Sequence, residues 1–199
     1  MLDKFKCFTV DEAEKWGEQH FRTWLPQLHS QDHDPQTDLE QFFRYYTQGT
    51  GHIFNRILRN GIESFDFSDS FFTEAMFIDS IAEIKKHKLS EDIVVFRYIQ
   101  PRYIERMLEW GGSRTVKKES ILSERGFLST TLSPEAVRDQ PYASKGNTCF
   151  KIYVPKGTPC VYVDLISDMH EQEMLFPPDT KLKVLKSSLF KKSIECIVI

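Results

Sequence analysis

The period of the hydrophobic pattern changes near residue 91, and this change limits the possible folds more than any other feature. Before it, apolar residues recur every three or four positions, which is typical of amphipathic helices. After it, short apolar runs and alternating patterns indicate β-strands. Helices followed by strands, with mostly antiparallel-looking connections, predict an α+β fold. We expect one compact domain over 1–199, helical over about 1–90 and β-rich over about 91–199.

Two capping boxes indicate where the first helices begin. In Thr9/Glu12 and in Thr37/Glu40 a glutamate follows a threonine by three residues, an arrangement that satisfies the free N–H groups at a helix start. The first helix should end near Pro26, and the second should break at a Gly-Thr-Gly stretch. Further helices are expected over 52–60 and 71–88, from Pro101, and after Ser133-Pro134. Strands are expected over 93–98, 127–131, 147–154, 159–164, 171–176, 181–188 and 193–199.

Composition and charge exclude several classes of protein. With 26 basic and 29 acidic residues the formal net charge is −3, so no basic excess points to nucleic acid. No apolar stretch approaches the ~18 residues of a membrane span, and the N-terminus lacks the features of a signal peptide. The four cysteines are scattered without a Cys-x-x-Cys pair, which argues against zinc. We therefore expect use in a cytosol, exit by a route without a classical signal, or an excised domain.

Three predicted strands each carry a side chain suited to chemistry. The first ends in Arg97, the second contains Ser129, and the third contains Glu171 and Glu173. Because side chains alternate along a strand, the two glutamates should share one face, with their Cα atoms about 7 Å apart. Like charges that close cost free energy unless a ligand or partner uses them. Each residue alone is ordinary; together they indicate a site.

These residues resemble the bacterial ADP-ribosyltransferase toxin domain of the arginine–serine–glutamate class, and within it the catalytic domains of actin-modifying binary toxins of the iota type. The segment 46–59 is similar to the family's tyrosine-to-asparagine helix, 94–97 to its arginine strand and 126–131 to its serine strand. Glu171-x-Glu173 matches its paired glutamates. The resemblance implies N-terminal helices packed on a two-sheet antiparallel or mixed β core.

The resemblance also implies NAD as the substrate, with no metal. Tyr46 and Asn55 would line the NAD pocket. Arg97 would bind the pyrophosphate, because a guanidinium donates two parallel hydrogen bonds to oxygen anions. Several relatives carry a second arginine after the first, but here that position is Tyr98, so Arg102 is expected to assist.

The remaining residues would perform the reaction. Cleavage of the nicotinamide–ribose bond develops positive charge on the sugar, as in glycoside hydrolysis. Glu173 would hydrogen-bond the ribose 2′-hydroxyl and stabilise that charge, and Ser129 would orient Glu173. Glu171 would accept a proton from an acceptor arginine, which is otherwise protonated and a poor nucleophile. Relatives with glutamine there modify asparagine or other acceptors, so Glu171 indicates an arginine on a protein, with actin expected by resemblance.

The resemblance implies that the loop 165–170 recognises the protein target, as the corresponding loop does in the family. Met169 and Ile166 are candidate exposed anchors, with the alternative that Ile166 belongs to the core. His170 should face away from the glutamates. The binary toxins carry a second, inactive copy of the fold, which these 199 residues lack. We therefore expect a secreted or injected toxin or effector acting in the host cytosol, or an excised domain.

Two other functions remain open at this point. One is an NAD glycohydrolase, in which water replaces the acceptor. The other is a catalytically silent copy of the fold that serves as a docking module. The intact arginine, serine and glutamate pair argue against the silent copy.

Overall fold

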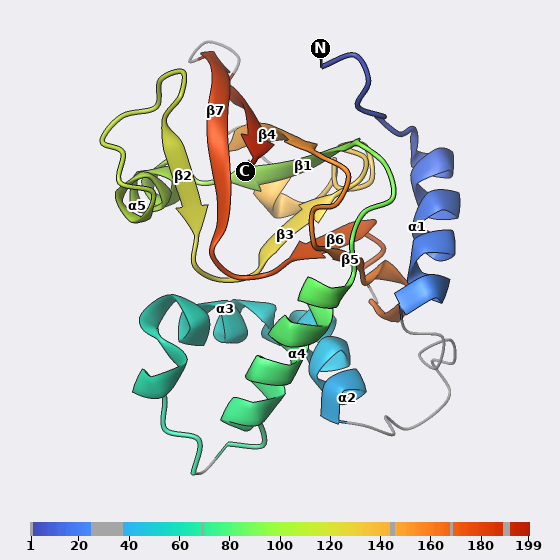
Figure 1. The fold of residues 1–199 in the computed structure, drawn as a ribbon, viewed down its shortest axis with the longest axis vertical. Coiled ribbons are helices and arrows are strands. Elements are labelled where there is room, and N and C mark those ends of the chain that lie inside the picture. The colour runs from blue at the N-terminus through green and yellow to red at the C-terminus, as the bar shows by residue number, and fades with distance from the viewer. Residues whose placement is uncertain (1, 25–37, 69, 144–145, 168, 189–191) are drawn as a thin grey trace.

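The computed structural model describes residues 2–24, 38–68, 70–143, 146–167, 169–188 and 192–199. Thr37 and Pro26, on which two helix boundaries were predicted, lie outside these residues. The chain begins with helices and continues with strands, as expected (Figure 1). None of the helices in these ranges is long and apolar enough to span a membrane.

The predicted helices form, with shifted ends. At the start of the first helix the glutamate half of the predicted capping box forms, since the Thr9 backbone N–H donates to the Glu12 carboxylate over 3.0 Å. A π-helical turn joins the second and third helices, where Gly49 adopts a φ of +103°. The fourth begins later than predicted, because the Thr73 hydroxyl accepts the Met76 N–H and caps it there. The α-helices are α1 Val10–Trp24, α2 Asp38–Tyr45, α3 Gly51–Asn60, α4 Glu74–Lys86 and α5 Pro101–Trp110.

The helix predicted after Ser133-Pro134 is wrong. The segment forms successive turns, with i→i+3 bonds such as Ala136 N–H to Ser133 C=O. Val137 is its one buried apolar side chain before the short 3₁₀ turn η4 (Pro141–Ala143), so the segment lacks the apolar stripe that stabilises an amphipathic helix.

Eight strands form a mixed sheet, which confirms the α+β fold class. Their order is β2-β7-β8-β4-β1-β3-β6-β5, and every neighbouring pair is antiparallel except β4 and β8. The resemblance implied two sheets, but the strands form one hydrogen-bonded sheet. Its narrowest point lies between β1 and β3, which pair only through Phe96 and Thr131. The strands are β1 Ile93–Ile99, β2 Ile121–Glu124, β3 Leu128–Thr131, β4 Thr148–Val154, β5 Val161–Tyr162, β6 Glu173–Phe176, β7 Thr180–Ser188 and β8 Ser193–Val198.

Alternation along β1 sets the direction of Arg97. Ile93, Val95 and Ile99 enter the main core with the helices, whereas Val94 and Phe96 join a smaller cluster on the other face. Arg97 has the parity of the first set, so it points to the side of the main core. Helices α2, α3 and α4 gather at one end of the sheet, and α1 lies along its β5 edge (Figure 1).

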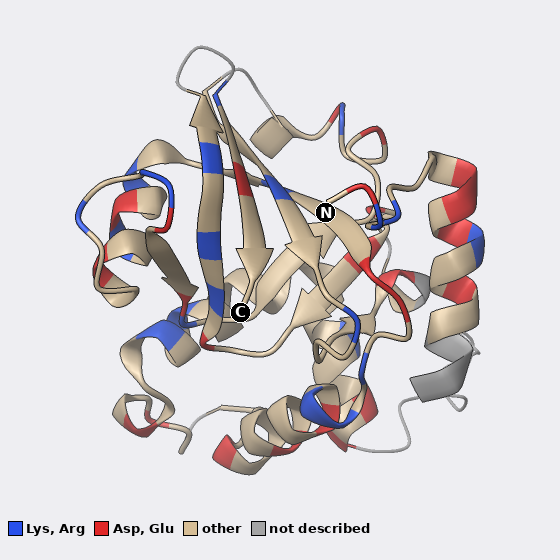
Figure 2. Ribbon diagram, turned by 45° about the horizontal axis from the view of Figure 1, so that its top comes forward, with Lys and Arg blue, Asp and Glu red and all other residues tan. Residues whose placement is uncertain are grey.

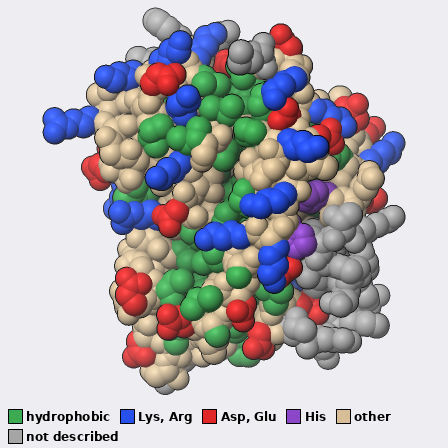
Figure 3. Space-filling model, viewed as in Figure 1, with side chains coloured by type: hydrophobic (Ala, Val, Ile, Leu, Met, Phe, Trp, Pro, Cys, Tyr) green, Lys and Arg blue, Asp and Glu red, His purple; other side chains and the backbone are tan. Residues whose placement is uncertain are grey.

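The small net charge hides a local separation of charge. Acidic residues lie along helix α1, and lysines lie along strand β7 (Figure 2). On the face seen in Figure 1, lysine and arginine side chains surround apolar ones (Figure 3). The composition alone, which predicted no basic excess, therefore does not describe the local surface.

Helix α1 is fastened to the sheet at two points. Gly17 faces the Tyr162 ring so closely that a Cβ atom there would overlap it. At the start of the helix, the Val10 carbonyl accepts a 2.9 Å hydrogen bond from the Gln172 side-chain amide. Because Gln172 lies between Glu171 and Glu173, α1 contributes directly to the placement of these glutamates.

Gly17→Ala should therefore destabilise the fold, although alanine favours helices. The gain in helix propensity is about 1 kcal/mol, whereas overpacking against Tyr162 costs about 1–3 kcal/mol. We expect a net loss of stability of up to about 2 kcal/mol in urea unfolding. Gly146→Ala is the control, since a Cβ atom there meets nothing within 4 Å. Equal stabilities for both variants would mean that α1 does not pack tightly on Tyr162.

Candidate active site

A buried glutamate that the sequence analysis did not single out organises the site. Glu124, the last residue of β2, accepts hydrogen bonds from Arg59 at 3.0 and 3.2 Å and from the Tyr103 hydroxyl at 2.7 and 2.9 Å. The Gly126 N–H donates to it over 2.9 Å, and Arg97 Nη2 lies 3.5 Å away. This one carboxylate therefore connects α3, α5, β1 and the turn before β3.

The charge of Glu124 is stabilised by its partners. Burial by itself would raise the pKa of this carboxyl, but the guanidinium groups of Arg97 and Arg59 hold the pKa below its ordinary value. The one feature of the sequence that could have drawn attention to Glu124 was its position, two residues before the glycine of the predicted serine strand. A single glutamate at such a position does not indicate that its side chain is buried.

Arg97 retains a donor for a ligand. Its Nη2 faces Glu124, while its Nη1 is buried and has no hydrogen-bond partner among the described residues. A buried donor without a partner is costly, and an anionic ligand would satisfy it.

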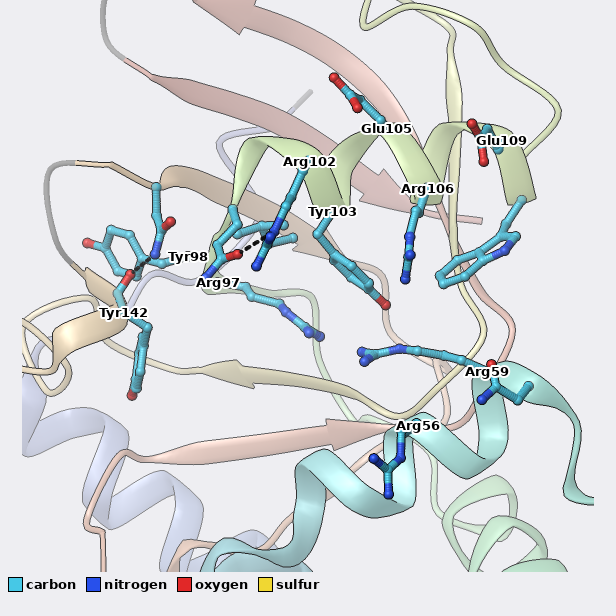
Figure 4. A pocket seen from close by; sticks show the side chains of 15 residues that line it. Arg56, Arg59, Arg97, Tyr98, Arg102, Tyr103, Glu105, Arg106, Glu109 and Tyr142 are labelled. Atoms are coloured by element: carbon cyan, nitrogen blue, oxygen red, sulfur yellow. Dashed lines mark hydrogen bonds between the residues drawn. The ribbon is translucent and has the colours of Figure 1, made fainter. Parts of the chain in front are cut away.

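Five arginines line a cleft of about 860 Å³ in front of Glu124. Arg102 and Arg106 reach down from α5, and Arg59 reaches across from the end of α3 toward Arg97 (Figure 4). Arg102, expected to assist Arg97, is exposed here and donates through Nε to Gln100 over 3.1 Å. So many guanidinium groups with four aromatic rings suit a ligand that has anionic oxygens and flat ring systems. The fifth arginine is Arg56, and the rings belong to Tyr98, Tyr103, Trp110 and Tyr142.

Tyr46 and Asn55 lie behind this cleft. Both side chains are buried, and neither belongs to the cleft lining that the described residues form. Asn55 Oδ1 accepts the Phe127 N–H over 2.6 Å, and its amide donates to the Tyr46 hydroxyl over 3.4 Å. A Cβ atom at Gly126 would come within 2.6 Å of Asn55 Oδ1, so this contact requires glycine. In the structure the pair ties α3 to β3.

A smaller cavity of about 190 Å³ adjoins the cleft, because the two share Arg97, Tyr98 and Tyr142 in their linings. Ser129 and Glu171 also line this cavity. The structure thus brings the predicted arginine, serine and first glutamate around one continuous space.

Glu173 does not line this cavity, but it is buried next to it and hydrogen-bonds Ser129, which does line it. It begins β6 opposite Thr131, and only 8% of its surface is exposed. Burial raises its pKa to about 7, and the charges of Glu171 and Asp164 add to this effect. A hydrogen bond with Ser129 and the charge of Arg97 oppose it. Glu173 therefore titrates near neutral pH, as a group used for catalysis often does.

The strand predicted from residue 171 is wrong over its first two residues. His170 and Gln172 have positive φ values of 50° and 53°, and β6 begins at Glu173. The Glu171 carbonyl accepts the Thr131 hydroxyl over 2.6 Å. A turn, and not strand alternation, places Glu171 at the cavity, because the Gln172 side chain is drawn toward α1.

Glu171 is half-buried and faces Tyr142. Burial raises the pKa of its carboxyl and the Asp164 charge contributes, whereas a hydrogen bond with the Tyr142 hydroxyl lowers it. His170 is exposed, as is Met169, which fits the expected recognition loop. Ile166 is buried, so the alternative that it belongs to the core is confirmed.

The described residues contain no group of three or more His, Cys, Asp or Glu side chains that could hold a metal ion. Cys160 and Cys196 are buried free thiols, Cys149 is half-buried and Cys7 is exposed.

The sequence model of the ADP-ribosyltransferase exoenzyme family matches residues 13–199. No curated protein matches the chain in sequence. Among solved structures, C3stau2 from S. aureus, solved with NAD, has 20% identity and a TM-score of 0.69, covering 98% of this chain and 99% of that one. The Clostridium limosum C3 exoenzyme has 18% identity and a TM-score of 0.69, covering 98% and 97%.

A binary toxin component has a similar fold. BECa, from a binary enterotoxin of C. perfringens and solved with NADH, has 19% identity and a TM-score of 0.67. The match covers 96% of this chain and 48% of that one. These similarities confirm the expected fold and toxin class, and with the match over residues 13–199 they show that this chain belongs to the ADP-ribosyltransferase exoenzyme family.

Proposed function

We propose that this protein transfers ADP-ribose from NAD to an arginine side chain of a protein, as a toxin or effector released into or injected into a host. One observation carries the proposal: Arg97, Ser129 and Glu171 line one cavity, and the buried Glu173 hydrogen-bonds Ser129 directly behind that lining. Actin is the acceptor that the resemblance to iota-type enzymes favours.

NAD fits the cleft by chemistry. The pyrophosphate would take the buried Nη1 of Arg97, with Arg59 and Arg102 beside it. Tyr103 and Trp110 offer rings against which a base can pack. The nicotinamide end would then enter the smaller cavity, near Ser129 and Glu173.

The reaction balances without a metal. The bond between the nicotinamide nitrogen and ribose C1′ breaks, and nicotinamide leaves with the electron pair. Glu173 stabilises the positive charge on the ribose through its 2′-hydroxyl. A nitrogen of the acceptor arginine attacks C1′, and the proton that it loses passes to Glu171. Glu171 lines this cavity and is only half-buried, so an acceptor side chain can approach it from outside, which favours transfer over simple hydrolysis.

The test is incubation of the protein with labelled NAD and host-cell lysate, followed by mass-spectrometric mapping of the modified residue. Label on an arginine supports the proposal, and label on actin supports the acceptor. NAD consumption without protein labelling would support a glycohydrolase. The absence of NAD consumption in lysate would contradict both.

Arg97→Lys should weaken NAD binding by about 1–3 kcal/mol, because lysine keeps the charge but loses the planar pair of donors. Calorimetric titration with NAD measures this change. Arg138→Lys is the control, since Arg138 is exposed and absent from the cleft lining. Unchanged affinity for Arg97→Lys would move the phosphate site elsewhere, with Arg102 as the next candidate.

Glu173→Gln should abolish both transfer and NAD hydrolysis while making the fold more stable at pH 8. The folded-state pKa of about 7 lies above the ordinary value of 4.5, so the wild type loses stability as the pH rises between these values. The neutral amide avoids this loss, which is on the order of 2–3 kcal/mol. Urea unfolding at pH 4.5 and pH 8 should show the difference only at pH 8.

Glu63→Gln, at an exposed glutamate, is the matched control and should change neither activity nor stability. Transfer by Glu173→Gln within tenfold of wild type would refute the catalytic role of Glu173. Unchanged stability at pH 8 would refute the raised pKa.

Glu171→Gln should separate the two activities. Arginine modification should be lost while slow NAD hydrolysis survives, since bond cleavage depends on Glu173. Removal of a proton acceptor costs about 10²–10⁴ in the rate of the step that uses it, so the activities should diverge by at least about 10²-fold. Glu135→Gln, at an exposed glutamate of the neighbouring loop, is the control. Equal losses in both activities would remove the case for arginine specificity.

A further inference from the structure

A third carboxylate lies behind the two glutamates. Asp164 opens the short 3₁₀ turn η5 (Asp164–Ile166) after β5, and only 8% of its surface is exposed. It lines neither cavity described above, so NAD would not touch it. Buried carboxylates are rare unless they have hydrogen-bond partners, and Asp164 has several.

Those partners belong to the turn that carries the glutamates. The Glu173 N–H donates to Asp164 Oδ1 over 3.4 Å, and the backbone N–H groups of Glu171 and Gln172 also donate to this carboxylate. Successive N–H groups converge in this way when neighbouring residues alternate between left- and right-handed conformations. His170 and Gln172 have the positive φ values that this alternation needs. Without an anion at its centre, the turn would leave buried N–H groups unpaired.

Asp164 also places a negative charge beside both glutamates. Its charge raises the pKa of Glu171 and of Glu173, in each case in addition to burial. Burial raises the pKa of Asp164 itself, and the turn's N–H groups and the charge of His170 oppose that rise.

Other titratable groups surround these carboxylates. Arg97 and Tyr46 lie near Glu173, and Tyr142 faces Glu171. On β5 the Tyr162 hydroxyl donates to Asp164 Oδ2 over 3.4 Å. Helix α1, along which acidic residues lie (Figure 2), brings Glu14 and Glu18 near that tyrosine. The charge of Arg97 opposes the rise in the pKa of Glu173, so loss of the Asp164 charge would leave the arginine less opposed.

We propose that Asp164 is a positioning residue for the transfer reaction: it fixes the 171–173 turn through backbone N–H groups and holds a buried carboxylate beside both glutamates. This inference rests on the proposed function for its consequence in catalysis. The geometry of the turn and the coupling of the three carboxylates stand apart from the identity of the acceptor.

The test compares Asp164→Asn with Asp164→Ala. Asparagine keeps an oxygen acceptor but removes the charge, whereas alanine removes both. For Asp164→Ala we expect kcat of NAD hydrolysis to fall by about 10–100-fold, while the NAD affinity stays within about threefold of wild type. The reason is that displacement of the glutamates impairs cleavage of the nicotinamide–ribose bond more than it impairs phosphate binding. For Asp164→Asn we expect kcat within about tenfold and a lower pH midpoint.

The pH profile carries the decisive measurement. In wild type, kcat/KM of NAD hydrolysis should rise through about pH 7 as Glu173 ionises. In Asp164→Asn the midpoint should fall by about 0.5–1 pH unit. NMR titration of ¹³C-labelled glutamate carboxyls in the protein without NAD should show the same fall for Glu173. A residue with only a structural role would lower the melting temperature without moving either midpoint.

Asp92→Asn is the matched control. Asp92 is half-buried and, like Asp164, accepts a backbone N–H, that of Lys156 at 2.8 Å, but it lines neither cavity. Asp92→Asn should leave kcat unchanged, together with the pH midpoint of kcat/KM and the NMR titration midpoint of Glu173. The inference is overturned if Glu173 titrates in Asp164→Asn as it does in wild type, or if Asp164→Ala keeps the wild-type kcat.

The two proposals fail in different ways. If the wild type consumes no NAD, the proposed function fails, while the NMR titration still tests the coupling. If the wild type consumes NAD and the Asp164 variants match it in rate and midpoint, only this inference fails. Should Asp164→Ala not fold, the Asp164→Asn measurements alone decide.

Discussion

The active-site cleft depends on one buried charge. Transfer of an ion into a protein interior costs several kcal/mol, and Glu124 has no exposed side-chain surface. That cost is offset only because Arg59, Arg97 and Tyr103 reach the same carboxylate from three different elements. Such a group favours one arrangement of α3, α5 and β1 over others, since the loss of any partner would leave a buried charge poorly compensated. The walls of the cleft and the direction of Arg97 follow from this group.

At the glutamates, in contrast to Glu124 with its arginine partners, charges of the same sign lie near one another. The charge of Asp164 raises the pKa values of Glu171 and Glu173, and the charge of Glu171 adds to the rise at Glu173. The rest of the fold must therefore offset repulsion between like charges at this site. Hydrogen bonds from the turn's backbone N–H groups, the Ser129 hydroxyl and the Tyr142 hydroxyl reduce this cost. In the proposed reaction, the positive charge that develops on the ribose in the transition state would reduce this cost further, because it attracts the carboxylates. The unbound protein is thus less stable at this site than it could be, which is common where catalysis needs unusual protonation.

The fold was largely predictable because its signals are local. Helices α1 to α5 each show their apolar period or a start signal, and the long strands show their alternation. The short strand β2 was missed, since Ile121–Glu124 has only two apolar residues and becomes a strand through pairing with β7. The turn at 170–172 was taken for strand because an alternating pattern continues through it, while its positive φ values depend on Asp164 and on the distant carbonyl of Val10.

The sequence by itself determined the fold class and the family, and it predicted Arg97, Ser129 and Glu171, which line one cavity in the structure. These depend on residue types in a fixed order, and order along the chain is what a sequence records. Tertiary structure alone decided that Glu124 joins the arginines, that Asn55 ties α3 to β3 and does not line the cleft, and that Glu173 titrates near pH 7. Each of these depends on burial and on contacts between residues far apart in the chain, such as the Asn55 side chain and the Phe127 N–H, which lie 72 residues apart. Burial and distance are fixed only when the elements pack.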